Sequence, residues 1–591
     1  MLRPQDNDCR ETKLLDGIWS FVADMEGVGR SEEWWRADLR RARAIAVPSS
    51  YNDLYVDRAL HDHVGDVWYQ RTVTVPRGWA GRRILLRFDA ACHRAVVWVG
   101  DTEVASHEGG YTPFEADISV HCRPGRPTRI TVVVNNELSW HSIPPGVVNV
   151  AADGLRTQHY YHDFFNYSGL HRSVWLHSTA HTRVDDVTVV TDIDGSTGVV
   201  HYRAAVTGTA EMSVQLHDEQ GNEVARADGA EGTLRVADAE LWRPGRGYLY
   251  DLRIDLRIDG SLVDSYHQPV GVRTVEVRGT EFLVNGEPVY FKGFGMHEDH
   301  VVRGKGHDPA SMIRDFELLG WIGANSFRTS HYPYAEEVLD HADRLGIMVI
   351  DETAAVGLNL GVGGGFFGGG PRTTFSPETI DDITAGVHRR AIEELVDRDK
   401  NHPSVVLWCV ANEPESHSDE SRTYFEPLFA RTRELDPTRP VGFVNMMFAP
   451  PGACKLVDLC DVVMINRYYG WYFQLDELAT AEQGLETELR GWAAYGKPVL
   501  VTEYGADTIA GLHTVEATPF SEEYQESFLE TYHRVFDRVP EVVGEHVWNF
   551  ADFATTTSFL RVEGNKKGVF TRDRRPKAAA HALRRRWTTE P

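Results

Sequence analysis

The C-terminal half of the chain alternates apolar runs with amphipathic segments, and this alternation constrains its fold more than any other feature. From about Glu276 onward, helical segments such as PASMIRDFELLGW and ETIDDITAGVHRRAIEELVDRDK lie between strand-like runs. The runs are PVYFKGFGM, GANSFRTSH, IMVIDE, SVVLWCVANE, VGFVNMM, DVVMINRYY, PVLVTEYG and GEHVWNFAD. Because strands that alternate with helices form parallel βα units, and eight such units close a barrel, residues 276–591 are predicted to form a (β/α)8 TIM barrel.

The first 275 residues have a different pattern, which is typical of β domains. Runs such as LDGIWSF and ITVVVNN lie between turn residues and predict an antiparallel β domain over residues 1–180. The runs VDDVTVVTDI and YDLRIDLRIDG continue at the spacing of an immunoglobulin-like β-sandwich, which is predicted over residues 181–275. A chain of 591 residues is too long for one core, and its length predicts about three or four domains.

Composition argues against several classes of protein. The chain has 87 acidic and 61 basic residues and a formal net charge of -26, so it is not expected to bind nucleic acids or anionic membranes. The start, MLRPQDNDCR, does not lead into an apolar run, and no long apolar window follows. The six cysteines lack CxxC spacing, which predicts neither a zinc site nor a disulfide framework. We therefore expect a soluble, cytoplasmic protein.

Two glutamates at predicted strand ends are the strongest candidates for chemistry. Glu413 ends the fourth run, in WCVANEPE, and Glu503 ends the seventh, in LVTEYG. The carboxyl ends of barrel strands form the open face where reacting groups gather. Paired carboxyl groups suit glycoside hydrolysis, because one protonates the leaving oxygen while the other attacks or activates water. A single strand-end glutamate could instead cap a helix or pair with an arginine, but a pair among Asn, His, Tyr and Trp favours catalysis.

Several segments resemble glycoside hydrolase family 2, and within it the bacterial β-glucuronidases. They are HYYHDFFNYSGLHR, FRTSHYPYAEE, RDKNHPSVVLWCVANEPE, INRYYGWY, VLVTEYGAD, HVWNFADF and GNKKGVFTRDRRPK. The resemblance covers the full length and implies a jelly-roll β-sandwich, an immunoglobulin-like β-sandwich and a catalytic barrel. It implies a retaining exo-β-D-glucuronidase that needs no metal or organic cofactor. Glu503 would be the nucleophile, and Glu413 the acid that becomes the base in the second step.

The resemblance also implies which residues bind the substrate. Asn412 would bind the sugar hydroxyl next to the anomeric carbon, and Asn565 and Lys567 would bind the sugar carboxylate, with Arg561 nearby. Asp163 would reach from the first domain to the sugar hydroxyls. The remaining pocket positions would be His331, Asn466, Tyr468, Tyr472 and Trp548. By themselves, GNKKG also fits a solvated turn, Asp163 a turn aspartate, and the aromatic residues core packing.

Two further segments allow alternative interpretations. MHEDHVVRGKGHD offers His297, His300 and His307, but the spacing is not that of a metal motif such as HExxH, and the family has a basic residue where Met296 stands. GVGGGFFGGGP, residues 361–371, occupies the position of a loop that contacts the aglycone in related gut bacterial enzymes. It is interpreted either as an apolar-tipped lid or as a connector.

The expected substrate is a β-glucuronide of a small molecule or of a glycan end. A β-galacturonidase or another family 2 β-glycosidase is the nearest alternative, because both glutamates would be shared. A non-catalytic carbohydrate-binding protein is a third, and the retained pair of carboxyl groups argues against it. Since members of the family often form dimers or tetramers, the resemblance also implies a homo-oligomer.

Overall fold

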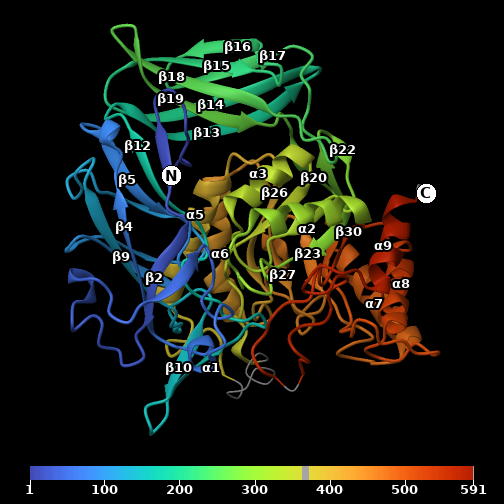
Figure 1. Cartoon of the computed structure of the whole chain (residues 1–591). Helices are drawn as coiled ribbons and strands as arrows, with labels where there is room; N and C mark the ends of the chain where they lie inside the picture. Colours follow the sequence, from blue (N-terminus) through green and yellow to red (C-terminus); the bar gives the residue numbers. More distant parts are fainter. Residues whose placement is uncertain (362–371, 559, 590–591) are drawn as a thin grey trace.

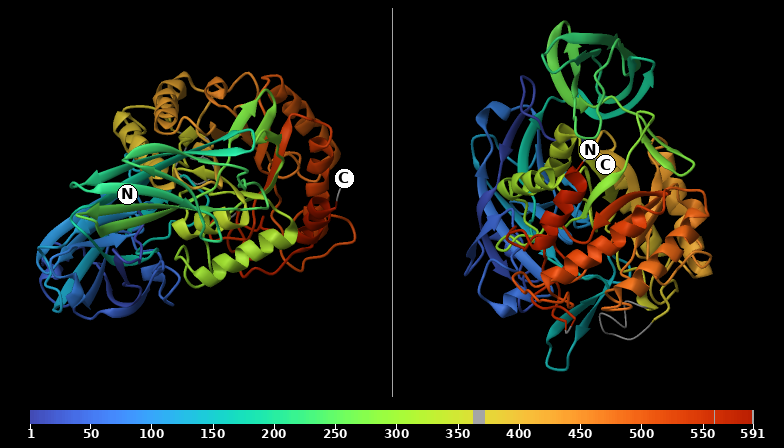
Figure 2. Two further views of the ribbon diagram at one scale, coloured as in Figure 1. Left: turned by 90° about the horizontal axis from the view of Figure 1, so that it is seen from above. Right: turned by 90° about the vertical axis from the view of Figure 1, so that its right-hand side faces the viewer.

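A computed structural model of the chain describes residues 1–361, 372–558 and 560–589. Figure 1 shows a β-sandwich from the N-terminal part beside a barrel from the C-terminal part, with a second set of sheets above them. The two further views in Figure 2 show the same arrangement from other sides. The predicted order of two β-sandwiches followed by a barrel is confirmed. The boundaries at residues 180 and 275 stay predictions.

The N-terminal sandwich consists of a six-stranded sheet, with the order β3-β2-β4-β9-β6-β7, and a four-stranded sheet, with the order β1-β12-β5-β8. Its core lies between apolar side chains of both sheets, including Trp19, Val97, Leu86 and Leu176. The hairpin of β10 and β11 extends from this region (Figure 1). The elements are β1 (Glu11–Leu14), β2 (Gly17–Ala23), β3 (Arg43–Val47), α1 (Arg58–His61), β4 (Asp66–Thr74), β5 (Arg83–Phe88), β6 (Arg94–Val99), β7 (Thr102–Glu108), β8 (Phe114–Asp117), β9 (Pro127–Asn135), β10 (Gly146–Val150), β11 (Arg156–Tyr160) and β12 (Val174–Thr179).

The immunoglobulin-like region packs the sheet β13-β14-β17 against the sheet β16-β15-β18-β19. Along β18, alternate residues Tyr250, Leu252, Ile254 and Leu256 are buried in the core between the sheets. This two-residue period is the one that a strand with one buried face requires. The strands are β13 (Arg183–Asp194), β14 (Thr197–Thr207), β15 (Glu211–His217), β16 (Glu223–Asp228), β17 (Glu231–Val236), β18 (Tyr250–Ile258) and β19 (Ser261–Val270).

A small sheet precedes the barrel, and the barrel closes from eight parallel strands. Seven of them lie within predicted runs, and the eighth begins at Val542, just before the predicted run GEHVWNFAD. Strands such as β26 are buried along their whole length, as parallel strands covered by helices must be. The strands of the small sheet are β20 (Val275–Arg278), β21 (Glu281–Val284) and β22 (Glu287–Pro288). Those of the barrel are β23 (Phe291–Gly295), β24 (Ser326–Arg328), β25 (Met348–Glu352), β26 (Val405–Asn412), β27 (Val441–Asn445), β28 (Val463–Asn466), β29 (Val499–Glu503) and β30 (Val542–Val547).

Local signals explain where the barrel helices begin and end. Helix α2 starts after Asp308, whose side chain accepts a hydrogen bond from the backbone of Ser311, and it ends at Gly323 with a φ of 86°. Helix α5 starts inside its predicted segment because Asp381 and Thr384 form a capping box. The helices of this half are α2 (Pro309–Ile322), α3 (Glu336–Leu345), α5 (Asp382–Asp399), α6 (Asp419–Leu435), α7 (Leu478–Ala493), α8 (Glu522–Phe536) and α9 (Ala578–Thr588).

Six barrel strands end on polar residues, and this positions the candidate site. Because all eight strands run in parallel, their last residues share one face of the barrel. The six polar last residues are Arg328 of β24, Glu352 of β25, Asn412 of β26, Asn445 of β27, Asn466 of β28 and Glu503 of β29.

Candidate active site

The carboxylate of Glu503 is buried and accepts hydrogen bonds from two donors. The side chain is 6% exposed, the hydroxyl of Tyr468 donates to it over 2.6 Å, and the guanidinium of Arg328 contacts its other oxygen. Burial raises the pKa of Glu503 above its ordinary value, and Arg328 and Tyr468 limit this rise by stabilising the charged form. The two donors therefore favour the ionised state that a nucleophile needs.

Glu413 follows β26 directly and has a different environment. Its backbone is in the left-handed region, with a φ of 50°, and its side chain accepts a hydrogen bond from the amide of Asn466 over 3.0 Å. Burial, and secondarily the negative charge of Glu503, raises the pKa of Glu413 to about 8. Glu413 therefore retains its proton at neutral pH, which is the state that a general acid needs.

Arg328 and Glu352 connect the strand ends, and the sequence analysis did not single out either residue as a site candidate. The guanidinium of Arg328 contacts Glu352 as well as Glu503, and it lies 3.3 Å from the amide oxygen of Asn412. That oxygen is also 3.3 Å from the amide nitrogen of Asn466. Arg328 therefore fixes groups on three other strands. Its place as a charged residue near the end of the predicted run GANSFRTSH was the signal that could have identified it.

His331 and Trp548 form one side of the site. Their rings stack with centroids 5.1 Å apart and planes 30° apart. The Nδ1 atom of His331 lies 2.8 Å from Glu352, and its Nε2 atom lies 3.8 Å from Glu503. Burial, followed by the positive charge of Arg328, holds the pKa of His331 well below its ordinary value. The imidazole is therefore neutral and can hydrogen-bond without adding a charge beside the carboxylates.

The segment from Arg561 to Lys567 brings positive charge to the same face of the barrel. Arg561 forms a bidentate ion pair with Asp163 of the N-terminal sandwich, with distances of 3.0 and 2.9 Å. The amide of Asn565 donates to Asp163 over 2.8 Å. The ammonium of Lys567 lies 3.0 Å from the hydroxyl of Tyr472. The structure therefore brings a residue of the N-terminal sandwich into contact with a segment of the C-terminal half of the chain.

Lys567 is a deeply buried cation. Its side chain is 1% exposed, and its ammonium contacts the carboxylate of Asp507. It also lies 4.7 Å from the ring centroid of Tyr472, 5.2 Å from that of Trp471 and 5.7 Å from that of Tyr468. Neither Asp507 nor Trp471 was singled out from the sequence. The contacts of Lys567 differ from those of a surface lysine in a solvated turn.

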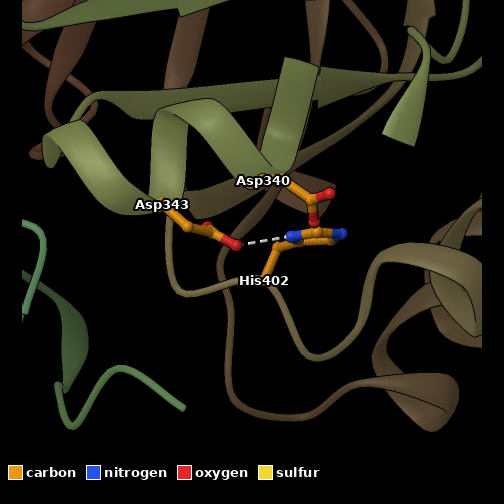
Figure 3. A group of neighbouring side chains, drawn as sticks. All are labelled: Asp340, Asp343 and His402. Atoms are coloured by element: carbon orange, nitrogen blue, oxygen red, sulfur yellow. Dashed lines mark hydrogen bonds and ion pairs between the residues drawn. The ribbon is translucent and has the colours of Figure 1, made fainter. Parts of the chain in front are cut away.

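Among the described residues, one group of side chains has the geometry to hold a metal ion, and it does not include the histidines near the site. The histidines of MHEDHVVRGKGHD are not among the groups of described residues that could hold an ion. Figure 3 shows the group that could, Asp340, Asp343 and His402. There, Nδ1 of His402 lies 2.6 Å from Asp343, and Arg3 forms an ion pair with Asp340. Because these groups already pair with one another and with Arg3, we assign them to the contact between the N-terminal segment and α3.

Most of the Gly-rich segment that was predicted to be a lid or a connector, residues 362–371, lies outside the described residues. Within the described ranges, none of the helices combines the length and apolarity needed to cross a bilayer.

Comparisons with known proteins match all three regions of the chain. Residues 12–180 match the sugar binding domain of glycosyl hydrolases family 2, residues 182–273 match glycosyl hydrolases family 2, and residues 275–590 match the family's TIM barrel domain. A β-glucuronidase of Paenibacillus borealis is 50% identical over 595 residues, covering 99% of this chain and 98% of that protein.

Two solved structures have the same fold over nearly the whole length. The β-glucuronidase of an uncultured Clostridium species is 44% identical, with a TM-score of 0.94 and coverage of 99% of both chains. The β-glucuronidase of Ruminococcus gnavus in complex with uronic isofagomine is 41% identical, with a TM-score of 0.96 and coverage of 99% of both chains. Since the family matches account for nearly all residues and the relatives for the full length, this chain is a glycoside hydrolase that belongs to family 2.

Proposed function

We propose that this chain is a retaining, exo-acting β-D-glucuronidase that releases glucuronate from small conjugates or from glycan ends. The observation that carries the proposal is the buried ammonium of Lys567 on the face that holds Glu413 and Glu503. Its full-length relatives are named β-glucuronidases, which supports the same substrate class.

The two glutamates suit a double displacement. In the first step, Glu503 attacks the anomeric carbon, the bond to the leaving oxygen breaks, and Glu413 gives its proton to that oxygen. In the second step, Glu413 takes a proton from water, whose oxygen replaces Glu503 on the anomeric carbon. Arg328 and Tyr468 bind the carboxylate of Glu503, which favours its ionised form before the attack.

Asn412, Asn466 and Asp163 are proposed to bind sugar hydroxyls, and His331, Tyr468, Tyr472 and Trp548 to shape the pocket around the ring. Asn565, Lys567 and Arg561 are proposed to bind the sugar carboxylate. An ammonium in a desolvated pocket forms a charge-assisted hydrogen bond with a uronate, whereas a neutral hexose leaves it without that partner. A homo-oligomeric state, as a dimer or a tetramer, stays a prediction.

Substituting Lys567→Ala is expected to lower kcat/KM for nitrophenyl β-glucuronide by about 10- to 150-fold, the scale of a hydrogen bond to a charged group. The rate on nitrophenyl β-glucoside should change much less. Lys566→Ala is the matched control, because the Lys566 ammonium lies 3.8 Å from the exposed Glu563, away from the Lys567 contacts. A wild-type preference for the glucoside, or equal effects of the two substitutions, would contradict uronate binding. A preference for the galacturonide would instead reassign the sugar epimer.

The pH dependence of kcat/KM tests the protonation of Glu413. Because the acid must carry its proton in the first step and its pKa is about 8, activity is expected to fall as the pH rises through about 8. In Glu413→Gln this alkaline limb should disappear when the leaving group is activated. The measurement is kcat/KM for nitrophenyl β-glucuronide from pH 5 to 10, and an unchanged alkaline limb in the variant would contradict the assignment.

A further inference from the structure

Asp507 contacts three parts of the segment that is proposed to bind the sugar carboxylate. One of its oxygens contacts the ammonium of Lys567 and lies 3.1 Å from the guanidinium of Arg561. The other oxygen accepts a hydrogen bond from the backbone N–H of Lys566 over 2.8 Å. The side chain of Asp507 is 5% exposed. A single buried carboxylate therefore holds both cations and the backbone between them.

The charges around Asp507 balance before any substrate is present. Lys567 and Arg561 are positive, and Asp163 and Asp507 are negative. Burial acts to raise the pKa of Asp507, but Lys567 and then Arg561 outweigh it, so its pKa lies below the ordinary value. Asp507 is thus ionised at neutral pH, and it compensates a buried ammonium that would otherwise be costly.

The contacts of Lys567 also show which of its N–H donors remains for a ligand. An ammonium has three N–H donors. Among the described residues, Asp507 and the hydroxyl of Tyr472 accept from two of them. The rings of Trp471 and Tyr472 restrict the space around the ammonium. Because two N–H bonds of the ammonium point to fixed acceptors, the direction of the third N–H bond is also fixed.

We infer that Asp507 is the positioning residue that gives this site its specificity for uronates. It would act by holding Lys567 and Arg561 in the arrangement that accepts the carboxylate of the sugar. The inference rests on the proposed function, since it concerns the same site. Asn at this position presents an NH2 group either to the cations or to the Lys566 N–H, so an isosteric substitution cannot preserve all three contacts.

The test compares Asp507→Asn with the wild type on nitrophenyl β-glucuronide and nitrophenyl β-glucoside. Displacing a binding group by about 1 Å can cost about 100-fold in rate, so the ratio of kcat/KM values, glucuronide to glucoside, should fall by about 10- to 100-fold. Asp552→Asn is the matched control, because Asp552 is also buried and binds a lysine, Lys577, that contacts the backbone oxygen of Lys566. The ratio for this control should stay at the wild-type value. An unchanged ratio in Asp507→Asn, or an equal fall in the control, would overturn the inference.

A double substitution covers the case in which Asp507→Asn does not fold. Removing both charges in Asp507→Asn/Lys567→Met avoids leaving a buried cation unpaired. If Asp507 acts through Lys567, this double variant should have the same ratio as Lys567→Met alone. A further tenfold fall in the ratio would overturn the inference. A wild-type enzyme without any preference for the glucuronide would instead reject the proposed function.

Discussion

Substituting Glu503→Ala is expected to lower kcat for nitrophenyl β-glucuronide by about 10⁴-fold or more, the scale on which loss of a covalent nucleophile acts. Without this carboxylate, no glycosyl-enzyme can form, and the charge that Arg328 and Tyr468 stabilise is absent. The fold should persist, because the barrel core does not depend on one side chain at a strand end.

Glu503→Gln is the control for shape, since it keeps the volume and one oxygen acceptor but cannot act as an effective nucleophile. Both variants should unfold cooperatively on heating, and both should lack the burst of nitrophenol that glycosyl-enzyme formation produces in the wild type when the second step is slow. Retention of more than a few per cent of the wild-type kcat by Glu503→Ala would show that another group attacks the sugar.

The second large effect is expected for Glu413→Ala, and its size should depend on the leaving group. An alkyl glucuronide needs a proton on its leaving oxygen, so its kcat/KM should fall by about 10²- to 10⁴-fold, the usual contribution of general acid catalysis. A nitrophenyl leaving group is stable as an anion and needs little help. Its kcat/KM, which reports formation of the glycosyl-enzyme, should therefore fall much less.

The measurement is kcat/KM for a series of aryl and alkyl glucuronides of increasing leaving-group pKa. In Glu413→Ala, log kcat/KM should decrease steeply along the series, whereas the wild type should show a shallower dependence. The kcat for nitrophenyl glucuronide should fall in the variant as well, because the second step also loses its base. Equal losses of kcat/KM on aryl and alkyl substrates would be incompatible with Glu413 as the acid.

Much of the fold was predictable because it depends on local patterns. The two-residue period along YDLRIDLRI predicts a strand with one buried face, and this segment forms β18. Apolar runs between amphipathic segments predicted the eight barrel strands, because parallel strands under helices are buried on both sides. The family resemblance extended these patterns to sugar-binding positions that periodicity does not reveal, such as Asp163.

The sequence by itself determined that Glu413 and Glu503 lie at strand ends on one face of the barrel, because the parallel strands of a closed barrel all end on the same face. Only the tertiary structure decided which partners these and other residues have. Arg561 meets Asp163 across 398 positions of the chain, and Arg328 meets Glu503 across 175. Such contacts depend on closure of the barrel and on packing of the N-terminal sandwich against it. Periodicity predicts which face of a strand or helix a side chain occupies, but not which distant charged group lies beside it. The contacts of Asp507 were therefore recognised only in the folded chain.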